Sequence, residues 1–125
     1  MDIETIIKTA RLGRARKEAQ VDTCTVFAAA LYDLLSENMP CKMVTAVSHG
    51  AFRWAHAVVE VDGRYYDSMG EFSIPIYRAR AKLHPTVKPN ISFQADSRQD
   101  CYEPEFDEMH AFYLQMLTKA ARSLV

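Results

Sequence analysis

Residues 54–70 read WAHAVVEVDGRYYDSMG, and this stretch decides the fold. The dipeptide Asp62-Gly63 is typical of a tight type I′ turn, in which both central residues have positive φ. The alternating and β-branched residues on either side favour strands over residues 52–61 and 64–67. The sequence therefore predicts a β-hairpin that is closed by two residues.

The register of this hairpin brings an acid close to a histidine. With a two-residue loop, Val61 pairs with Arg64. Asp67 then lies opposite Val58, which shares one face of the strand with His56 because side chains alternate. Diagonal neighbours in such a pair are about 7–8 Å apart at the backbone. We therefore expect the carboxylate of Asp67 to reach an imidazole N–H of His56.

A helix is expected over residues 22–36, DTCTVFAAALYDLLS, upstream of the hairpin. Asp22 is a good N-cap, and apolar residues recur at helical spacing: Val26, Phe27, Ala30, Leu31, Leu34 and Leu35. Cys24 falls in the first turn, where unpaired backbone N–H groups and the positive end of the helix dipole lower the pKa of a thiol. Cys24 is thus positioned as a nucleophile would be, although a small cysteine that only starts a buried helix is commoner.

These three side chains can act together if the start of the helix packs against the hairpin. Cys24 would then be the nucleophile, His56 the base and Asp67 the acid that orients the imidazole. Taken singly, a strand histidine is more often a core residue, and an aspartate at this place is more often a turn residue. Zinc ligation is a weaker alternative, since the chain has no paired Cys or His spacing typical of a closed zinc site.

An anionic tetrahedral intermediate would also need hydrogen-bond donors. The backbone N–H of Cys24 is one candidate, because it lies at the start of the helix. The side-chain amide of Gln20 and the indole N–H of Trp54 are two further candidates for oxyanion or substrate binding. Gln20 is also interpretable as an ordinary surface residue.

The remaining sequence predicts further helices and strands around this centre. Ile3, Ile6, Ile7 and Ala10 lie on one helical face, so residues 2–17 form an amphipathic helix whose second half is basic. That basic half is interpretable as a solvated face or as a site for an acidic partner. The other expected elements are a strand over residues 41–47, a turn over 48–50, an irregular stretch over 70–100 with a short helix at 77–82 and a strand at 91–94, and a helix over 105–124.

Composition restricts the class of protein. The 125 residues are 49% hydrophobic and 25% charged, as in an ordinary globular protein, and predict a single domain over residues 1–125. No apolar run approaches the roughly 20 residues that span a bilayer, and the start does not resemble a signal peptide. A net charge of −1 gives no global attraction to nucleic acid or membranes. Three cysteines without an export signal predict reduced thiols and a cytoplasmic location.

The order and spacing of these residues resemble a known family. Residues 22–47, DTCTVFAAALYDLLSENMPCKMVTAV, followed by 54–70, resemble the core of the transglutaminase-like proteins within the papain-like cysteine enzyme superfamily. In that family a cysteine opens an Ala- and Leu-rich helix, a histidine follows on a strand, and an aspartate lies on the next strand. Cys24, His56 and Asp67 occupy those places. The resemblance implies an α+β fold with the nucleophile helix packed on a central antiparallel sheet and with flanking terminal helices.

The resemblance also implies thiol chemistry on amide or thioester carbonyls. We expect a cysteine hydrolase that cleaves an amide of a peptide or protein through a Cys24–His56–Asp67 triad and an acyl-enzyme. No cofactor and no metal are expected. A peptide-binding module of the same fold and an acyltransferase that accepts an amine remain alternatives.

Overall fold

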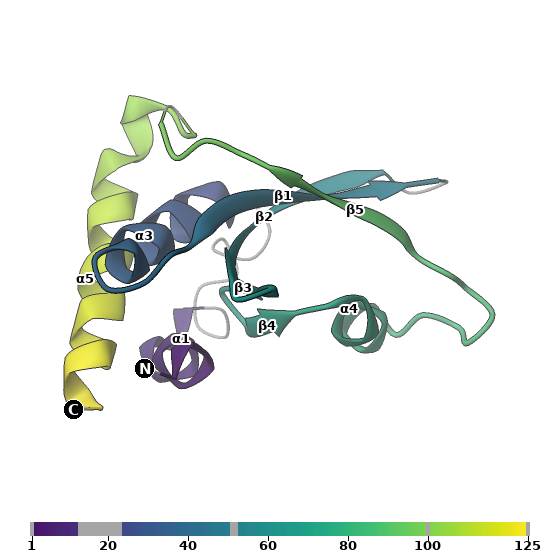
Figure 1. The fold of residues 1–125 in the computed structure, drawn as a ribbon, viewed down its shortest axis with the longest axis horizontal. Helices are drawn as coiled ribbons and strands as arrows, with labels where there is room; N and C mark the ends of the chain where they lie inside the picture. Colours follow the sequence, from purple (N-terminus) through teal and green to yellow (C-terminus); the bar gives the residue numbers. More distant parts are fainter. Residues whose placement is uncertain (1, 13–23, 51–52, 100, 125) are drawn as a thin grey trace.

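The computed structural model describes residues 2–12, 24–50, 53–99 and 101–124. Within these residues the fold is α+β, with four helices packed on a five-stranded antiparallel open sheet (Figure 1). The helices are α1 (Ile3–Ala10), α3 (Cys24–Ser36), α4 (Ile74–Ala81) and α5 (Asp107–Ser123), and a 3-10 turn, η2 (Pro104–Phe106), precedes α5. None of these helices has both the length and the apolar character that crossing a membrane requires.

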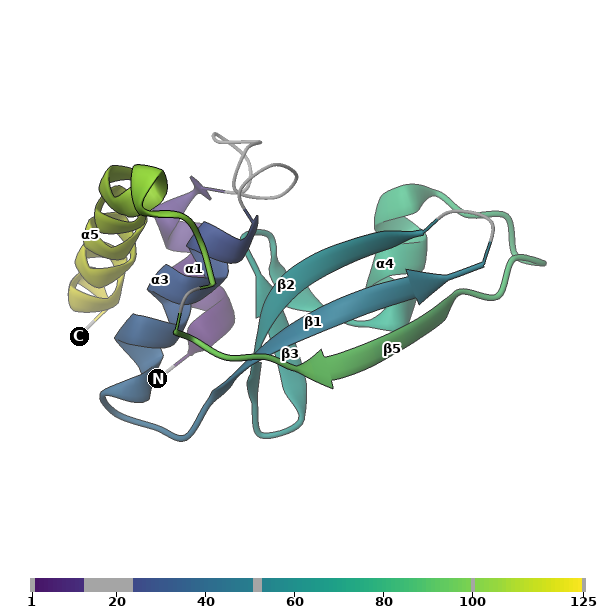
Figure 2. The ribbon, with the colours of Figure 1, turned by 90° about the horizontal axis from the view of Figure 1, so that it is seen from above.

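The sheet is a meander to which the fifth strand is added at one edge. Its strands are β1 (Lys42–His49), β2 (Trp54–Val61), β3 (Arg64–Asp67), β4 (Gly70–Phe72) and β5 (Asn90–Ala95). They lie in the order β4-β3-β2-β1-β5, and every neighbouring pair is antiparallel. The ends of β1, β2 and β5 extend away from α1, α3 and α5 (Figure 2).

The hairpin between β2 and β3 has the predicted register. Val61 pairs with Arg64, as the sequence predicts. Asp62 and Gly63 both have positive φ, 51° and 79°, which is the signature of the type I′ turn. The turn therefore fixes which side chains of the two strands share a face.

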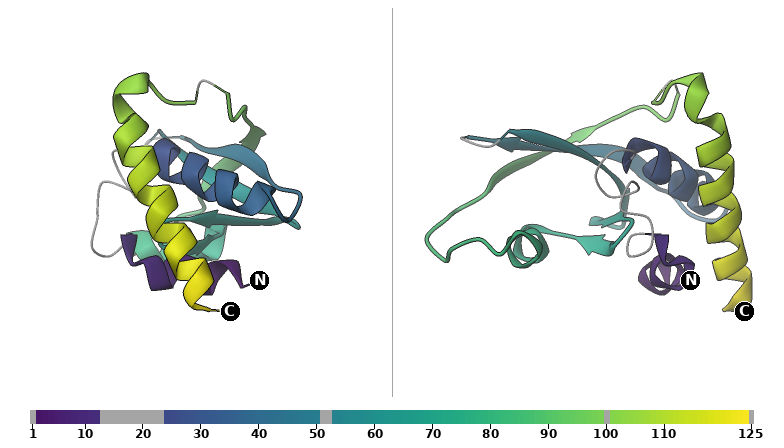
Figure 3. Two further views of the ribbon diagram at one scale, coloured as in Figure 1. Left: turned by 90° about the vertical axis from the view of Figure 1, so that its left-hand side faces the viewer. Right: turned by 180° about the vertical axis from the view of Figure 1, so that it is seen from behind.

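The main core lies between the sheet and helices α1, α3 and α5. Helix α3 is covered by β2 on one side and by α5 on another, so that α3 is buried on several faces (Figure 3). Its run of Ala28, Ala29 and Ala30 is almost fully buried and lets neighbouring elements approach closely. Leu117 on α5 is fully buried in the same core.

A second, smaller core fills the other face of the curved sheet. Val44, Ala46, Val58 and Phe72 are buried there and are flanked by aromatic side chains. Tyr65 on β3 stacks on Phe93 of β5 with a centroid distance of 4.1 Å, although two strands separate β3 from β5 in the sheet. The sheet must therefore curl strongly, and α4 packs beside β4 on this side.

Several predicted boundaries differ from the structure. The first helix ends at Ala10 instead of residue 17, because Arg11 adopts the left-handed conformation with φ 59°. The start predicted at Asp22 for the second helix lies outside the described residues, as do residues 13–17 at the end of the predicted first helix. Ser48 and His49 continue β1 and do not form the predicted turn, because they pair with Trp54 on β2 and with β5.

The segment after the hairpin is more ordered than the sequence predicts. Strand β4 was not predicted. The short helix predicted at 77–82 is present as α4, but it begins earlier, at Ile74, because Ser73 caps it by accepting a hydrogen bond from the Ile76 N–H at 3.2 Å. The predicted strand at 91–94 is confirmed as β5, and the last helix is confirmed as α5 within two residues of its predicted start.

Candidate active site

Cys24 is the first residue of α3 and lies at an unpaired edge of β2. The ladder between β2 and β3 stops at the pair Val59–Tyr66. In a two-residue hairpin Val61 exchanges hydrogen bonds with its partner, so alternate residues back along β2, including Ala57, point their N–H groups away from β1. β3 does not cover Ala57. The backbone N–H of Ala57 donates its hydrogen bond to the Cys24 sulfur instead. The end of the ladder thus makes room for the thiol.

His56 and Asp67 form the contact that the hairpin register predicts. His56 Nε2 lies 2.9 Å from Asp67 Oδ2. Both residues are buried, with 8% of His56 and 1% of Asp67 exposed. In a site so far removed from water, a charge-assisted hydrogen bond is stronger than it would be at the surface. The aspartate therefore fixes the orientation of the imidazole.

The turn between β3 and β4 holds Asp67 in place. The Met69 backbone N–H donates to Asp67 Oδ1 at 2.9 Å, an aspartate-to-backbone bond two residues along the chain that is typical of tight turns. Asp67 also pairs with Gly70, whose φ of 117° lies in a region that favours glycine. The position of the carboxylate is thus set by local backbone geometry before any contact with the histidine.

His56 also interacts with the Cys24 thiol. Nε2 is engaged by Asp67, which leaves Nδ1 for the hydrogen bond that His56 makes with the Cys24 side chain. Cys24, His56 and Asp67 are therefore brought together in one chain of contacts. The sequence predicted this juxtaposition, and the bond from Ala57 to the sulfur was not predicted.

This geometry favours charge separation between the thiol and the imidazole. Burial opposes ionisation of the Cys24 thiol, but hydrogen bonds from His56 and Ala57 and the positive charge of His56 hold its pKa below the ordinary value. Burial likewise opposes the charged form of His56, but hydrogen bonds to Asp67 and Cys24 outweigh it and raise the pKa of His56 to about 9. The site thus favours a thiolate paired with an imidazolium.

Arg80 on α4 is a site residue that the sequence analysis missed. Its Nη1 donates to Asp67 Oδ2 at 2.6 Å, and its Nη2 donates to Asp67 Oδ1 at 3.1 Å. Burial would raise the pKa of Asp67, but the hydrogen bonds and charges of His56 and Arg80 keep it below the ordinary value. Arg80 lies 13 residues from Asp67 in a segment without a clear periodic pattern, so no sequence signal connects the two.

The two proposed oxyanion donors outside the triad have different outcomes. The indole N–H of Trp54 donates to the Tyr77 hydroxyl at 3.1 Å, which joins β2 to α4. An oxyanion role for Trp54 would require this bond to break. Gln20 lies outside the described residues. The backbone N–H of Cys24 at the start of α3 is compatible with the predicted role, since the first N–H groups of a helix have no intrahelical acceptor.

A second polar cluster joins α3 to the C-terminal part of the chain. The Asp33 carboxylate accepts two hydrogen bonds from the Arg98 guanidinium, each of 2.8 Å, and lies 2.7 Å from His110 Nε2. Arg98 also donates to the Cys101 sulfur at 3.6 Å. Cys101 and His110 therefore help to link α3, α5 and the segment between β5 and α5. Burial raises the pKa of Cys101, so this cysteine is less readily ionised than Cys24.

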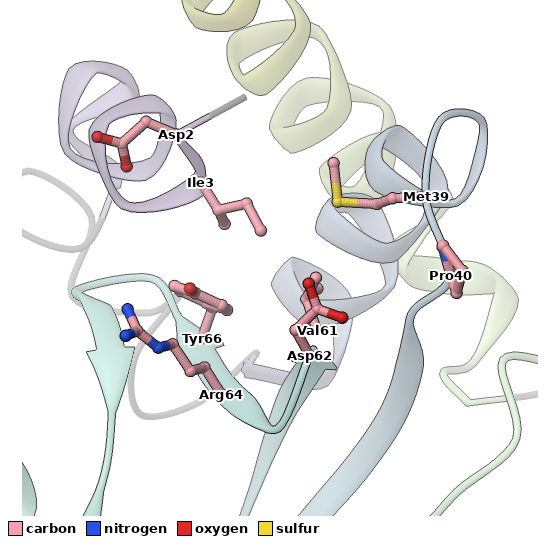
Figure 4. A pocket seen from close by; sticks show the side chains of 8 residues that line it. All are labelled: Asp2, Ile3, Met39, Pro40, Val61, Asp62, Arg64 and Tyr66. Atoms are coloured by element: carbon pink, nitrogen blue, oxygen red, sulfur yellow. The ribbon is translucent and has the colours of Figure 1, made fainter.

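Among the described residues, no group of three or more Cys, His, Asp or Glu side chains could hold a metal ion. A pocket of about 470 Å³ lies between the start of α1 and the turn of the hairpin, lined by Ile3, Met39, Asp62, Arg64 and other residues (Figure 4). Cys24, His56 and Asp67 are not among the residues that line this pocket.

No family model, no curated protein and no solved structure matches this chain. A functional conclusion must therefore rest on the fold and on the contacts around Cys24 alone.

Proposed function

We propose that this protein is a cysteine hydrolase that cleaves an amide bond of a peptide or protein. The observation that carries the proposal is the continuous chain from the Cys24 thiol to His56 and on to the Asp67 carboxylate. Nucleophile, base and orienting acid in this order are the arrangement that acyl transfer requires. The resemblance to the transglutaminase-like and papain-like enzymes supports the same arrangement, including the papain-like fold.

The reaction would proceed in two halves. The Cys24 thiolate attacks the carbonyl carbon, and a C–S bond forms as the carbonyl π electrons move to oxygen. When the tetrahedral intermediate collapses, the C–N bond breaks and the His56 imidazolium gives its proton to the leaving amine. Water then attacks the thioester with His56 as base, the acid product leaves, and the thiolate–imidazolium pair is restored. Asp67 stabilises the charged imidazole and keeps its Nδ1 directed at the sulfur.

The pKa values support this division of roles. The lowered pKa of Cys24 favours the nucleophilic thiolate. The pKa of His56, at about 9, keeps a proton available for the leaving amine at neutral pH. Cys41 offers a contrast within the same chain, because burial and the charge of Asp33 raise its pKa.

Labelling with a library of electrophilic peptide-amide probes tests the proposal. The native chain should react at Cys24, and Cys24→Ala should lose both labelling and turnover of the matching peptide amides. Cys41→Ala is the matched control and should keep both. Equal, slow labelling of Cys24, Cys41 and Cys101 at pH 6–7 would overturn the proposal.

The products distinguish hydrolysis from its two alternatives. A hydrolase releases the free acid when water is the only acceptor. Turnover that appears only after an amine is added would identify an acyltransferase. Reversible peptide binding that Cys24→Ala retains, without any turnover by the native chain, would identify a binding module.

A further inference from the structure

We propose that Arg80 is a positioning residue whose charge allows ionised Cys24, His56 and Asp67 to coexist in the buried site. The inference rests on the proposed function, because it concerns how the same triad is kept in its reactive state. It assigns a role to α4, which the triad itself does not explain.

The carboxylate of Asp67 is saturated with hydrogen-bond donors. A carboxylate offers about four acceptor positions on its two oxygens. His56 and Arg80 occupy Oδ2, while Met69 and Arg80 occupy Oδ1. The two-pronged contact fixes the carboxylate plane as well as its distance, which a single donor cannot do.

The guanidinium is itself held in place on three sides. Besides the two contacts with Asp67, Arg80 Nη2 donates to the Glu71 carbonyl oxygen at 3.0 Å. The guanidinium carbon lies 5.9 Å from the centroid of the Phe72 ring, within the range of a cation–π contact. Phe72 in turn lies 5.4 Å from the His56 ring. The same few side chains therefore surround both the imidazole and the guanidinium.

The charges of the site alternate along this chain of contacts. In the reactive state Cys24 and Asp67 are negative, and His56 and Arg80 are positive. Without Arg80 the set would carry one excess negative charge in a poorly hydrated place, where unbalanced charge is costly. The site would then relieve that charge by keeping a proton on Cys24 or Asp67. Arg80 thus favours the ionised form of the Cys24 thiol indirectly, through Asp67 and His56.

A purely structural role for Arg80 makes a different prediction. None of the residues of α4 is fully buried, so Arg80 also serves to dock this helix beside β4. Loss of docking alone would lower the melting temperature and leave the pH dependence of Cys24 in the folded protein unchanged. The test must therefore separate the charge of Arg80 from its contacts.

Two substitutions provide this separation in the full chain. Arg80→Gln removes the positive charge. Arg80→Lys keeps the charge but cannot make the two-pronged contact with Asp67. The rate of Cys24 alkylation by iodoacetamide is measured from pH 4 to 9, with peptide mass spectrometry to resolve the three cysteines. A positive charge in direct contact with an acidic group lowers the pKa of that group by about 1–3 units, and a more distant charge lowers it less. The midpoint of this pH profile is the pH at which the alkylation rate of Cys24 is half its maximum. We expect Arg80→Gln to raise the midpoint by about one pH unit, which is a roughly tenfold slower reaction at acidic pH. We expect the midpoint of Arg80→Lys to stay near that of the native chain.

Arg78→Met is the matched control on the same helix. Arg78 donates to the carbonyl oxygens of His84, Pro85 and Val87 and stabilises the loop after α4. Its loss should lower the melting temperature and leave the midpoint of Cys24 unchanged.

The outcomes keep the two proposals apart. If Cys24 of the native chain is alkylated fast and the midpoint in Arg80→Gln equals that of the native chain, the role of Arg80 is overturned and the hydrolase proposal stands. A midpoint of Arg80→Lys that rises by a full unit would also overturn it, even if Arg80→Gln fails to fold. Cys24 of the native chain reacting like an ordinary thiol would overturn the proposed function instead.

Discussion

Replacing Asp67 by asparagine removes the carboxylate and keeps a side chain of nearly the same shape. The pKa of His56 is raised from 6.5 to about 9, and the hydrogen bond to Asp67 is the largest contribution in that direction. At about 1.36 kcal/mol per pKa unit, the difference corresponds to roughly 3 kcal/mol of stabilisation of the imidazolium. Burial opposes this charge, so the variant should bring the pKa of His56 to about 7 or below. The thiolate of Cys24 then loses its charged partner.

NMR titration of the histidine rings in labelled protein measures this pKa directly. His56 is assigned by comparison with His56→Gln. Asp33→Asn is the matched control, because it removes a carboxylate from His110 and should leave the titration of His56 unchanged. A pKa of His56 that stays near 9 in Asp67→Asn would refute the reasoning, since another group would then have to stabilise the imidazolium.

Three further variants test other parts of the structure. In the native chain the folded state holds a proton on His56 and the unfolded state holds one on the Cys24 thiol, so these two contributions to the pH dependence of stability oppose each other. Cys24→Ala removes the thiol contribution, so stability should fall more steeply with rising pH than in the native chain, by up to about 1.4 kcal/mol per pH unit between pH 6.5 and the folded pKa of His56. Urea unfolding at several pH values measures this, and equal slopes would contradict it. Leu117→Ala should cost about 2–5 kcal/mol in the same assay, because the fully buried side chain leaves a cavity, and a cost below 1 kcal/mol would contradict the assigned core. Gly70→Ala should cost about 1–3 kcal/mol from backbone strain at φ 117°, while unchanged stability would show that this turn adapts.

The hairpin was predictable because its determinants are local. Asp62 and Gly63 specify the turn, the turn specifies the register, and the register places Asp67 near His56. The first turn of α3 similarly places Cys24 at a helix start. The hypothesis that the helix start meets the hairpin needed the family pattern or the triad chemistry, since nothing local to Cys24 specifies its distance from His56.

The segment from β4 through α4 was not predictable in the same way. Helix α4 has no fully buried residue and no apolar stripe, so its sequence carries no periodic signal. Its position depends on contacts made with distant residues, above all Arg80 with Asp67 and Tyr77 with Trp54. The interior partners of a charged residue cannot be deduced from sequence spacing alone, which is why Arg80 was missed.

The ultraviolet absorbance of the thiolate near 240 nm, measured against pH as the difference between the native chain and Cys24→Ala, tests the ion pair most directly. We predict that the thiolate of Cys24 in the native chain persists to pH values below the ordinary range of a thiol pKa. A difference signal that is absent at pH 7 and appears only as the pH approaches 9 would show an unactivated cysteine and would contradict the account of this site.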